Sequence, residues 1–144
     1  MIHPTAIIGE PPEHREWKPG DPLHYPEIDE SAQIYALVTI DSGRRSPTRV
    51  GARTMVMKHV YIGHDAEIGA DCELAAGTVI AGHVKLGDRV RVGVNACVRP
   101  FIEIGDGARI GAGAVVVKDV PPGVVVAGNP ARPLPPKDRS LHAA

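Results

Sequence analysis

The chain has 144 residues, which corresponds to one domain and is enough to bury a hydrophobic core. Its 16 Lys and Arg residues nearly balance its 17 Asp and Glu residues, and it has no basic stripe that would contact nucleic-acid phosphates. The start, MIHPTAIIGE, is unlike a secretory signal, and no apolar segment reaches the roughly 18 residues that span a membrane. We therefore expect a soluble, cytoplasmic protein with neither nucleic acid nor membrane as a partner.

The first 49 residues combine short repeated segments with two interruptions. IHPTAI, IDESAQ and IYALVT fit a spacing of six residues. Residues 10–27 contain five prolines and the only tryptophan, and residues 42–49, SGRRSPTR, form a basic turn. Such compositions are typical of surface loops. We expect loop insertions at about 10–27 and 42–49, each of which suits an oligomer contact as well as a substrate lid.

From residue 50 onward the sequence repeats every six residues. Twelve consecutive hexapeptides begin with Val, Ile or Leu, and their fifth residues, ending at Val120, are all small or β-branched. Gly stands second in seven of the twelve. Apolar residues at positions one and five lie two apart across each boundary, which is the alternation of a strand and not of a helix. Each hexapeptide therefore predicts a short strand followed by a corner.

Three such strands would close a triangular coil of 18 residues, and stacked coils would form three parallel sheets around an apolar interior. This pattern resembles the left-handed parallel β-helix of the hexapeptide-repeat acyltransferases, and the resemblance implies the handedness. We expect an all-β fold of about five to six triangular coils with protruding loops. A single domain would cover residues 1–133, followed by a C-terminal tail at 134–144.

Two histidines interrupt the repeat at one predicted corner. Residues 18 apart stack about 4.8 Å from each other, so His64 lies beneath Gly82, and Asp65 lies beneath His83. A histidine can accept a proton near neutral pH, an acid can orient it, and a glycine amide can hold an oxyanion. This predicts a catalytic group of four residues.

The other histidines have weaker arguments. His3, His14, His24 and His142 lie in end or loop segments, where the repeat provides no geometric argument for a role. His59 belongs to the preceding side of the coil and need not meet His64 in the same subunit. It remains a candidate for contact with a neighbouring subunit's corner.

The segments MKHVYIGHD and LAAGTVIAGHVKLGD resemble the UDP-N-acetylglucosamine O-acyltransferases. The resemblance implies that His64 is the general base, that Asp65 and His83 support it, and that the Gly82 amide holds the oxyanion. Tyr61 stands where that family has another histidine, and Arg99 and Pro100 replace its His-Gln pair. Tyr61, Arg99 and His59 are therefore candidate substrate-binding residues.

The end of the repeat, IGAGAVVVKDVPPGVVVAGNPAR, resembles that of coenzyme-A-dependent hexapeptide acetyltransferases. The resemblance implies acyl-coenzyme A as a co-substrate and no permanently bound cofactor. Glycines would allow a narrow corner for the pantetheine arm, and cations would meet its phosphates. The candidate residues are Gly111, Gly113, Lys118, Asn129 and Arg132. Capping the open end of the helix is an alternative role for this segment.

Together these features predict transfer of an acyl group, in particular acetyl, from coenzyme A or a related thioester. The acceptor would be a hydroxyl or amino group of a sugar or nucleotide sugar. The family resemblance also implies a homotrimer with active sites between subunits. A zinc hydratase like carbonic anhydrase is one alternative, but Gly69 stands where we expect a third ligand, so we predict no metal. A catalytically idle scaffold is the other.

Overall fold

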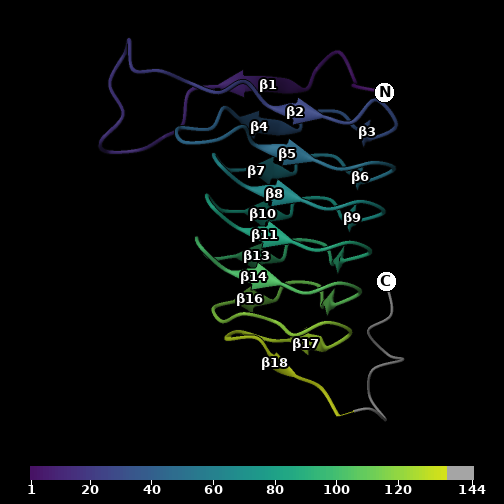
Figure 1. Ribbon diagram of the computed structural model, residues 1–144. Coiled ribbons are helices and arrows are strands. Elements are labelled where there is room, and N and C mark those ends of the chain that lie inside the picture. The colour runs from purple at the N-terminus through teal and green to yellow at the C-terminus, as the bar shows by residue number, and fades with distance from the viewer. Residues whose placement is uncertain (136–144) are drawn as a thin grey trace.

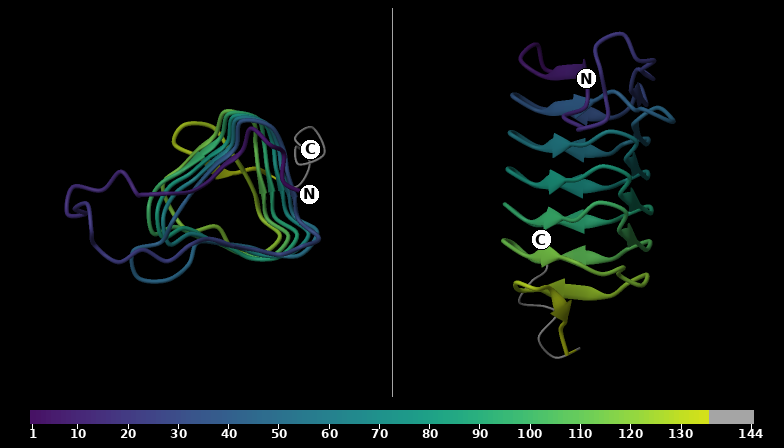
Figure 2. Two further views of the ribbon diagram at one scale, coloured as in Figure 1. Left: turned by 90° about the horizontal axis from the view of Figure 1, so that it is seen from above. Right: turned by 90° about the vertical axis from the view of Figure 1, so that its left-hand side faces the viewer.

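The computed structural model describes residues 1–135, and these form a triangular prism of short strands without any helix (Figures 1 and 2). The predicted left-handed parallel β-helix of about six turns is confirmed. No helix that could span a membrane occurs in the described part of the chain. Of the predicted C-terminal tail, residues 136–144, which include His142, lie outside the described residues.

Each face of the prism is one sheet, and its strands stack in chain order. The first face contains β1 (Ile7–Glu10), β4 (Thr39–Asp41), β7 (Tyr61–Ile62), β10 (Val79–Ile80), β13 (Cys97–Val98) and β16 (Val115–Val116). The second contains β2 (Glu27–Ile28), β5 (Arg49–Val50), β8 (Glu67–Ile68), β11 (Lys85–Leu86) and β14 (Glu103–Ile104). The third contains β3 (Gln33–Ile34), β6 (Met55–Val56), β9 (Glu73–Leu74), β12 (Arg91–Val92), β15 (Arg109–Ile110), β17 (Val125–Ala127) and β18 (Arg132–Pro133).

The register between coils follows the hexapeptide repeat. Ile62 pairs with Ile80 and Ile80 with Val98, a spacing of 18 residues that confirms the predicted columns. The spacing changes after Val116, because Val120 pairs with Ile104. The prediction that Val120 is a fifth-position residue is therefore wrong. The corner there is two residues shorter, so Val120 takes the first position of its strand.

The apolar positions of the repeat fill the interior. First-position side chains such as Ile62, Leu74 and Ile80 are fully buried, and fifth-position residues such as Val84 pack among them. The fourth position lies at the corner and takes a left-handed backbone conformation, with φ of 60° at Asp65 and 61° at His83. This conformation turns the chain sharply between two flat faces.

Two insertions leave the prism at the corner between the first and second faces. The first follows β1 and projects far from the prism, and the second links β4 to β5 (Figures 1 and 2). His24 in the first insertion and Gly43 in the second exchange two backbone hydrogen bonds of 2.8 Å. The two loops therefore support each other beside one corner, which we call the histidine corner (residues 63–65, 81–83 and 99–101).

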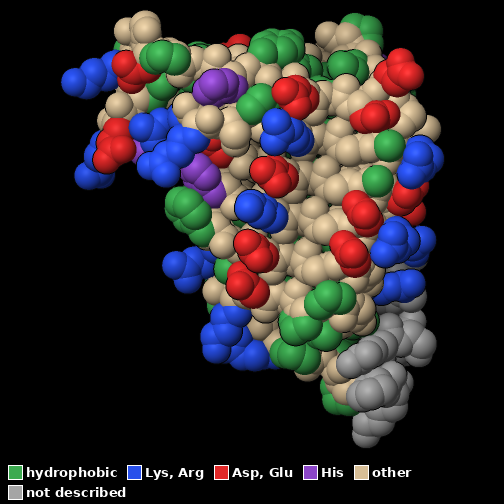
Figure 3. All heavy atoms as spheres, in the orientation of Figure 1, with side chains coloured by type: hydrophobic (Ala, Val, Ile, Leu, Met, Phe, Trp, Pro, Cys, Tyr) green, Lys and Arg blue, Asp and Glu red, His purple; other side chains and the backbone are tan. Residues whose placement is uncertain are grey.

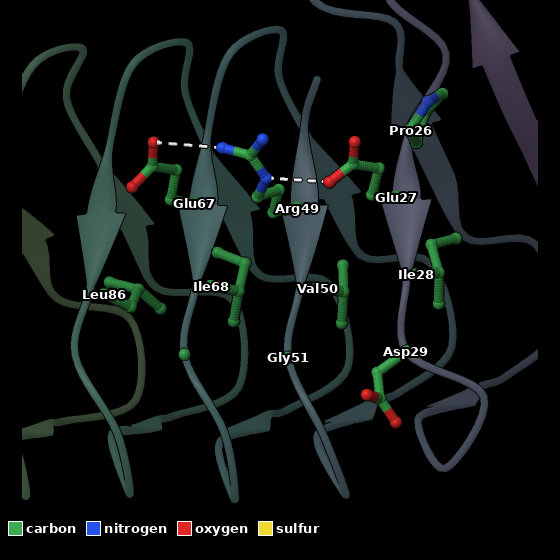
Figure 4. A pocket seen from close by; sticks show the side chains of 11 residues that line it. Pro26, Glu27, Ile28, Asp29, Arg49, Val50, Gly51, Glu67, Ile68 and Leu86 are labelled. Carbon is green, nitrogen blue, oxygen red and sulfur yellow. Dashed lines mark hydrogen bonds and ion pairs between the residues drawn. The ribbon is translucent and has the colours of Figure 1, made fainter. Parts of the chain in front are cut away.

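The outward side chains differ between faces. On the second face, they alternate in charge along the column Glu27, Arg49, Glu67, Lys85 and Glu103. Figure 4 shows Arg49 between two carboxylates, with its Nε 2.9 Å from Glu27 and its Nη1 3.9 Å from Glu67. On the first face, the corresponding column has no charged residue and contains Ile7, Thr39, Tyr61, Val79, Cys97 and Val115. The second face is thus suited to exposure to solvent, and the first face is suited to contact with another protein surface.

Candidate active site at the histidine corner

His64 lies at the centre of the histidine corner with its imidazole oriented by Asp65. The His64 Nδ1 is 2.8 Å from Oδ2 of Asp65, and the His64 side chain is 12% exposed. The Nδ1–H donates this hydrogen bond to the carboxylate and keeps its proton, which leaves the lone pair on Nε2. The local geometry is therefore that of an imidazole whose Nε2 can accept a proton.

Asp65 is held in turn by the second insertion. Its carboxylate accepts backbone hydrogen bonds from Arg44 (3.0 Å), Arg45 (2.7 Å) and Ser46 (2.9 Å). Burial raises the pKa of this carboxyl, but the hydrogen bonds from the three amides and His64 together outweigh it and hold the pKa well below its usual range. Asp65 is therefore ionised, and it links the insertion to the imidazole.

His83 sits one coil further along, next to His64. The two rings are 5.0 Å apart in an edge-to-face arrangement, and the His83 Nε2 is 3.8 Å from Oδ2 of Asp65. The other side of His83 stacks on Phe101 at 4.5 Å. Burial lowers the pKa of His83, repulsion from His64 and the nearby arginines adds to this, and attraction to Asp65 opposes it. His83 is thus favoured in its neutral form.

Gly82 leaves room for the reactive nitrogen of His64. A Cβ at Gly82 would lie 2.8 Å from His64 Nε2 and 2.9 Å from its Cε1. The Gly82 N–H has no hydrogen-bond acceptor within residues 1–135, whereas its carbonyl accepts the Phe101 amide. The absence of a Cβ therefore keeps the His64 Nε2 accessible. The backbone N–H of Gly82 is available as a hydrogen-bond donor beside it.

His14, from the first insertion, also meets His64, a contact for which the hexapeptide repeat offers no geometric argument. The two rings are 5.3 Å apart and nearly perpendicular. Arg44 Nη1 lies 3.2 Å from His14 Nε2, and Arg44 Nη2 lies 3.6 Å from Glu16. Contacts between two loops far apart in sequence leave no periodic signal, so the repeat could not reveal this one. Figure 3 shows histidine side chains (purple) close to Lys or Arg side chains (blue) at this edge.

The three candidate substrate-binding residues lie along the first face. Tyr61 projects outward from β7 and donates a hydrogen bond of 2.7 Å to Asp41. Arg99 is exposed at the histidine corner, one coil beyond Ala81. His59 is exposed at the other edge of the face, in the corner formed by residues 58–59, 76–77, 94–95 and 112–113, which we call the opposite corner. The structure thus brings Tyr61 and Arg99, but not His59, to the same edge as His64.

The residues proposed to bind coenzyme A lie in separate parts of the structure. Lys118 and Arg132 line one cavity of about 200 Å³ at the C-terminal end of the prism. Gly113 lies at the opposite corner, and Gly111 is buried just before it. Asn129 is exposed and does not line that cavity. Only the two cations therefore come together within one chain.

His64, Asp65 and His83 also form a group that could hold a metal ion, since one ligand atom of each lies within 4.8 Å of the others. A metal bound to Asp65 Oδ2 would compete with His64 Nδ1 and the Arg44 amide, which both contact that oxygen. The hydrogen bonds at this carboxylate suit the orientation of an imidazole better than a cation site.

Residues 47–82 and 83–118 match the model of the bacterial transferase hexapeptide family (six repeats). The chain belongs to this family. It is 35% identical over 138 residues to UDP-3-O-acylglucosamine N-acyltransferase of Caulobacter sp. (strain K31), covering 92% of this chain and 41% of that protein. The chain spans about half the length, or somewhat less, of the curated relatives it matches.

Solved structures of this family show the same architecture. UDP-N-acetylglucosamine O-acyltransferase from Moraxella catarrhalis RH4 has a TM-score of 0.88 and 32% identity, covering 99% of this chain and 57% of that one. The acetyltransferase domain of PglB from Neisseria gonorrhoeae FA1090, in complex with acetyl coenzyme A, has a TM-score of 0.70 and 28% identity, covering 92% and 56%. The resemblance inferred from the His64 and His83 segments is therefore confirmed.

Proposed function

We propose that this protein is an acyltransferase that moves an acyl group from a thioester to a hydroxyl or amino group of a sugar or nucleotide sugar. His64 Nε2 takes a proton from the acceptor, which then attacks the thioester carbonyl. The Gly82 N–H stabilises the resulting oxyanion. The carbon–sulfur bond then breaks, and the thiolate receives the proton from the His64 imidazolium.

The observation that carries this proposal is the orientation of His64. Its Nδ1 is bonded to a buried, ionised carboxylate, and its Nε2 faces the space that Gly82 leaves open. The orienting carboxylate also stabilises the imidazolium that forms when the base takes a proton. His83 and Phe101 limit the movement of the ring from the other side. The relatives are named for acyl transfer to UDP-sugars, which supports the same chemistry.

Coenzyme A is the donor that the C-terminal residues support. Lys118 lies at the same corner of the prism as His64, two residues after Val116, which is three coils beyond Ile62; three coils correspond to about 14 Å at the usual strand spacing. An extended pantetheine arm can cross this distance along the histidine corner past Phe101. Lys118 and Arg132 would then meet the coenzyme phosphates, and the acetyl coenzyme A bound by a structural relative supports this donor class.

We further propose a homotrimer whose contact surface is the first face. Val79 (40% exposed) and Ile7 (49% exposed) lie in its outward column, which has no charged residue. In a cyclic trimer, the opposite corner of one subunit can approach the histidine corner of the next, which would bring His59 and Gly113 to the site. Light scattering should give three times the chain mass, and a monodisperse monomer would contradict this assembly.

The release of free thiol tests the proposed function. Purified protein should release thiol from acetyl-coenzyme A only when a sugar nucleotide acceptor is present, and His64→Ala should slow that release about 10²–10⁴-fold. Acyl-carrier-protein thioesters should be compared as donors in parallel. Absence of turnover with every donor and acceptor, together with an intact trimer, would favour a scaffold and contradict the proposal.

A further inference from the structure

Aromatic rings from two parts of the chain contact the proposed base. His83 meets His64 from the next coil towards the C-terminal end, with ring centroids 5.0 Å apart. His14 meets it from the first insertion, which follows β1 at the N-terminal end of the prism (Figure 1). These two rings are 5.3 Å apart, with their planes at 88°. With Phe101 stacked on His83, four rings form a row in which His14 alone comes from outside the repeat.

The backbone of His14 is held in a defined turn. Its N–H donates to the Pro12 carbonyl at 2.8 Å, and its own carbonyl accepts the Trp17 N–H at 3.0 Å. Pro12 is buried, and the fixed φ of a proline restricts the chain just before the turn. The chain is therefore tied on both sides of His14, and its ring is presented to His64 from a fixed backbone.

Both ring nitrogens of His14 face donors other than His64. Arg44 Nη1 lies 3.2 Å from Nε2, and the Glu16 amide nitrogen lies 3.2 Å from Nδ1. A guanidinium has donors and no acceptor, so the Nε2 lone pair accepts the hydrogen bond from Arg44. His14 is therefore placed to pack against His64 and not to exchange a proton with it.

Arg44 connects His14 to the carboxylate that orients the base. Its backbone N–H donates to Asp65 Oδ2 at 3.0 Å, and the same oxygen accepts the bond from His64 Nδ1 at 2.8 Å. Its side chain, which is 23% exposed, reaches His14 and, at 3.6 Å, Glu16. One residue of the second insertion therefore holds both the hydrogen-bond partner of His64 and a ring that packs on it.

We propose that His14 is a positioning residue for the general base. Its ring, anchored by Arg44, keeps Nε2 of His64 directed at the acceptor. A single hydrogen bond at Nδ1 leaves an imidazole free to tilt about that bond, and a ring packed against it restricts the tilt. Misplacing a reacting group by about 1 Å can cost 10²-fold in rate, so this restriction matters for catalysis. The inference rests on the proposed function and adds a residue of the first insertion to its site.

The ring nitrogens of His64 test this positioning without any substrate. In ¹⁵N-labelled protein above about pH 8, where imidazole is neutral, their NMR shifts report which nitrogen carries the proton. We expect the proton on Nδ1 in the parent, with the His64 signals assigned by their loss in His64→Ala. In His14→Ala, the two shifts should move towards their average. Averaged shifts in the parent, or unchanged shifts in His14→Ala, would overturn the inference.

Two further variants serve as controls for this measurement. His14→Phe keeps a ring at the position and lacks both nitrogens, so it should preserve the shifts of the parent. His24→Ala removes an exposed histidine of the same insertion and should have no effect on His64. A change in His24→Ala as large as that in His14→Ala would contradict a specific role for His14.

The kinetic signature of positioning is a loss in kcat without a loss in acceptor affinity. Thiol release from acetyl-coenzyme A would be measured with UDP-N-acetylglucosamine, or with whichever sugar nucleotide the parent uses fastest. We expect His14→Ala to lower kcat about tenfold and to change KM for the acceptor by less than about twofold. His14→Phe should restore most of kcat. Equal losses in the two variants would assign the effect to a ring nitrogen and overturn the inference.

Combined variants separate positioning from a general role in the loop. A residue that acts through His64 has no further effect once His64 is removed, so His14→Ala should leave the residual rate of His64→Ala unchanged. Arg44→Gln keeps the backbone bond to Asp65 and should lower kcat about as much as His14→Ala, with no further loss when the two are combined. A second loss in the absence of His64 would show that His14 is structural and overturn the inference. A parent without turnover would contradict the proposed function, and the His64 nitrogen shifts would still decide whether His14 positions the ring.

Discussion

Asp65 and Asp71 occupy the same position in consecutive hexapeptides but have different surroundings. Both adopt the left-handed corner conformation, with φ of 60° and 56°. Asp71 is 42% exposed at its side chain and pairs with Arg53 one coil away, at 2.7 and 2.8 Å. The Asp65 side chain is 1% exposed. It instead accepts hydrogen bonds from three backbone amides and from the ring of His64. The repeat fixes the backbone at both corners, and the insertion changes the chemistry at one.

This difference indicates where a repeat protein can build a site. A solvent-exposed corner allows only weak ion pairs, because water screens the charges. At the histidine corner, the second insertion covers the carboxylate and replaces water with fixed N–H donors. Fixed donors in a dry site support catalysis better than mobile water does. Substitutions at the covered corner should therefore have larger effects than the same substitutions at an exposed corner.

The largest expected effect is at His64. His64→Ala should reduce kcat about 10²–10⁴-fold, the range expected for loss of a general base. His83→Asn should reduce it only about tenfold, because it removes one supporting interaction, and Asn tolerates the left-handed conformation at this position. Both variants should keep nearly the parent melting temperature. Thiol-release kinetics with saturating acceptor measure the contrast, and full activity in His64→Ala would show that this corner is not catalytic.

Gly82→Ala should have the next largest effect. The added methyl would lie 2.8 Å from His64 Nε2, so the ring must shift away from its reactive position. We expect a loss of about 10²-fold in kcat, the size of effect that misplacing a reacting group by about 1 Å can have. Gly107→Ala is the control for adding a methyl at a corner, since nothing lies within 4 Å of its Cβ, although its φ of 68° adds local strain. A Gly82→Ala enzyme with parent activity would mean that Nε2 is not the reacting atom.

The sequence was sufficient for much of the fold and for part of the site. The hexapeptide period determines the register, so the stacking of His64 next to Gly82 and of Asp65 next to His83 could be predicted from spacing alone. The shortened corner before Val120 was missed, because an aliphatic residue satisfies either position of the repeat. The contacts of His14 and Arg44 depend on how two loops fold against each other. Loops without periodicity carry no register, so only the structure reveals these contacts.

Asp65→Asn and Asp71→Asn test the comparison through stability. At Asp65, an amide NH₂ would replace one oxygen that accepts backbone N–H groups, and the charge that strengthens these bonds would be lost. We expect the free energy of unfolding to fall by about 2–3 kcal/mol. Asp71→Asn changes an exposed ion pair and should leave the urea midpoint unchanged within error. Equal losses in the two variants would show that the insertion contributes nothing to Asp65.

The smallest expected effect is the pH dependence of that stability difference. The pKa of Asp65 is lowered in the folded protein, so its charge stabilises the fold fully above the unfolded-state pKa of about 3.9. That contribution is lost as the pH falls below this value towards the folded-state pKa, because the unfolded chain then binds the proton first. The gap in unfolding free energy between the parent and Asp65→Asn should therefore be constant from pH 7 to 5 and smaller by about 1 kcal/mol at pH 3. Urea titrations at each pH measure this gap, with Asp71→Asn, whose curve should stay close to the parent's, as the reference. A gap that grew on acidification would mean that Asp65 is protonated in the folded protein, and His64 would then lack the carboxylate that orients it.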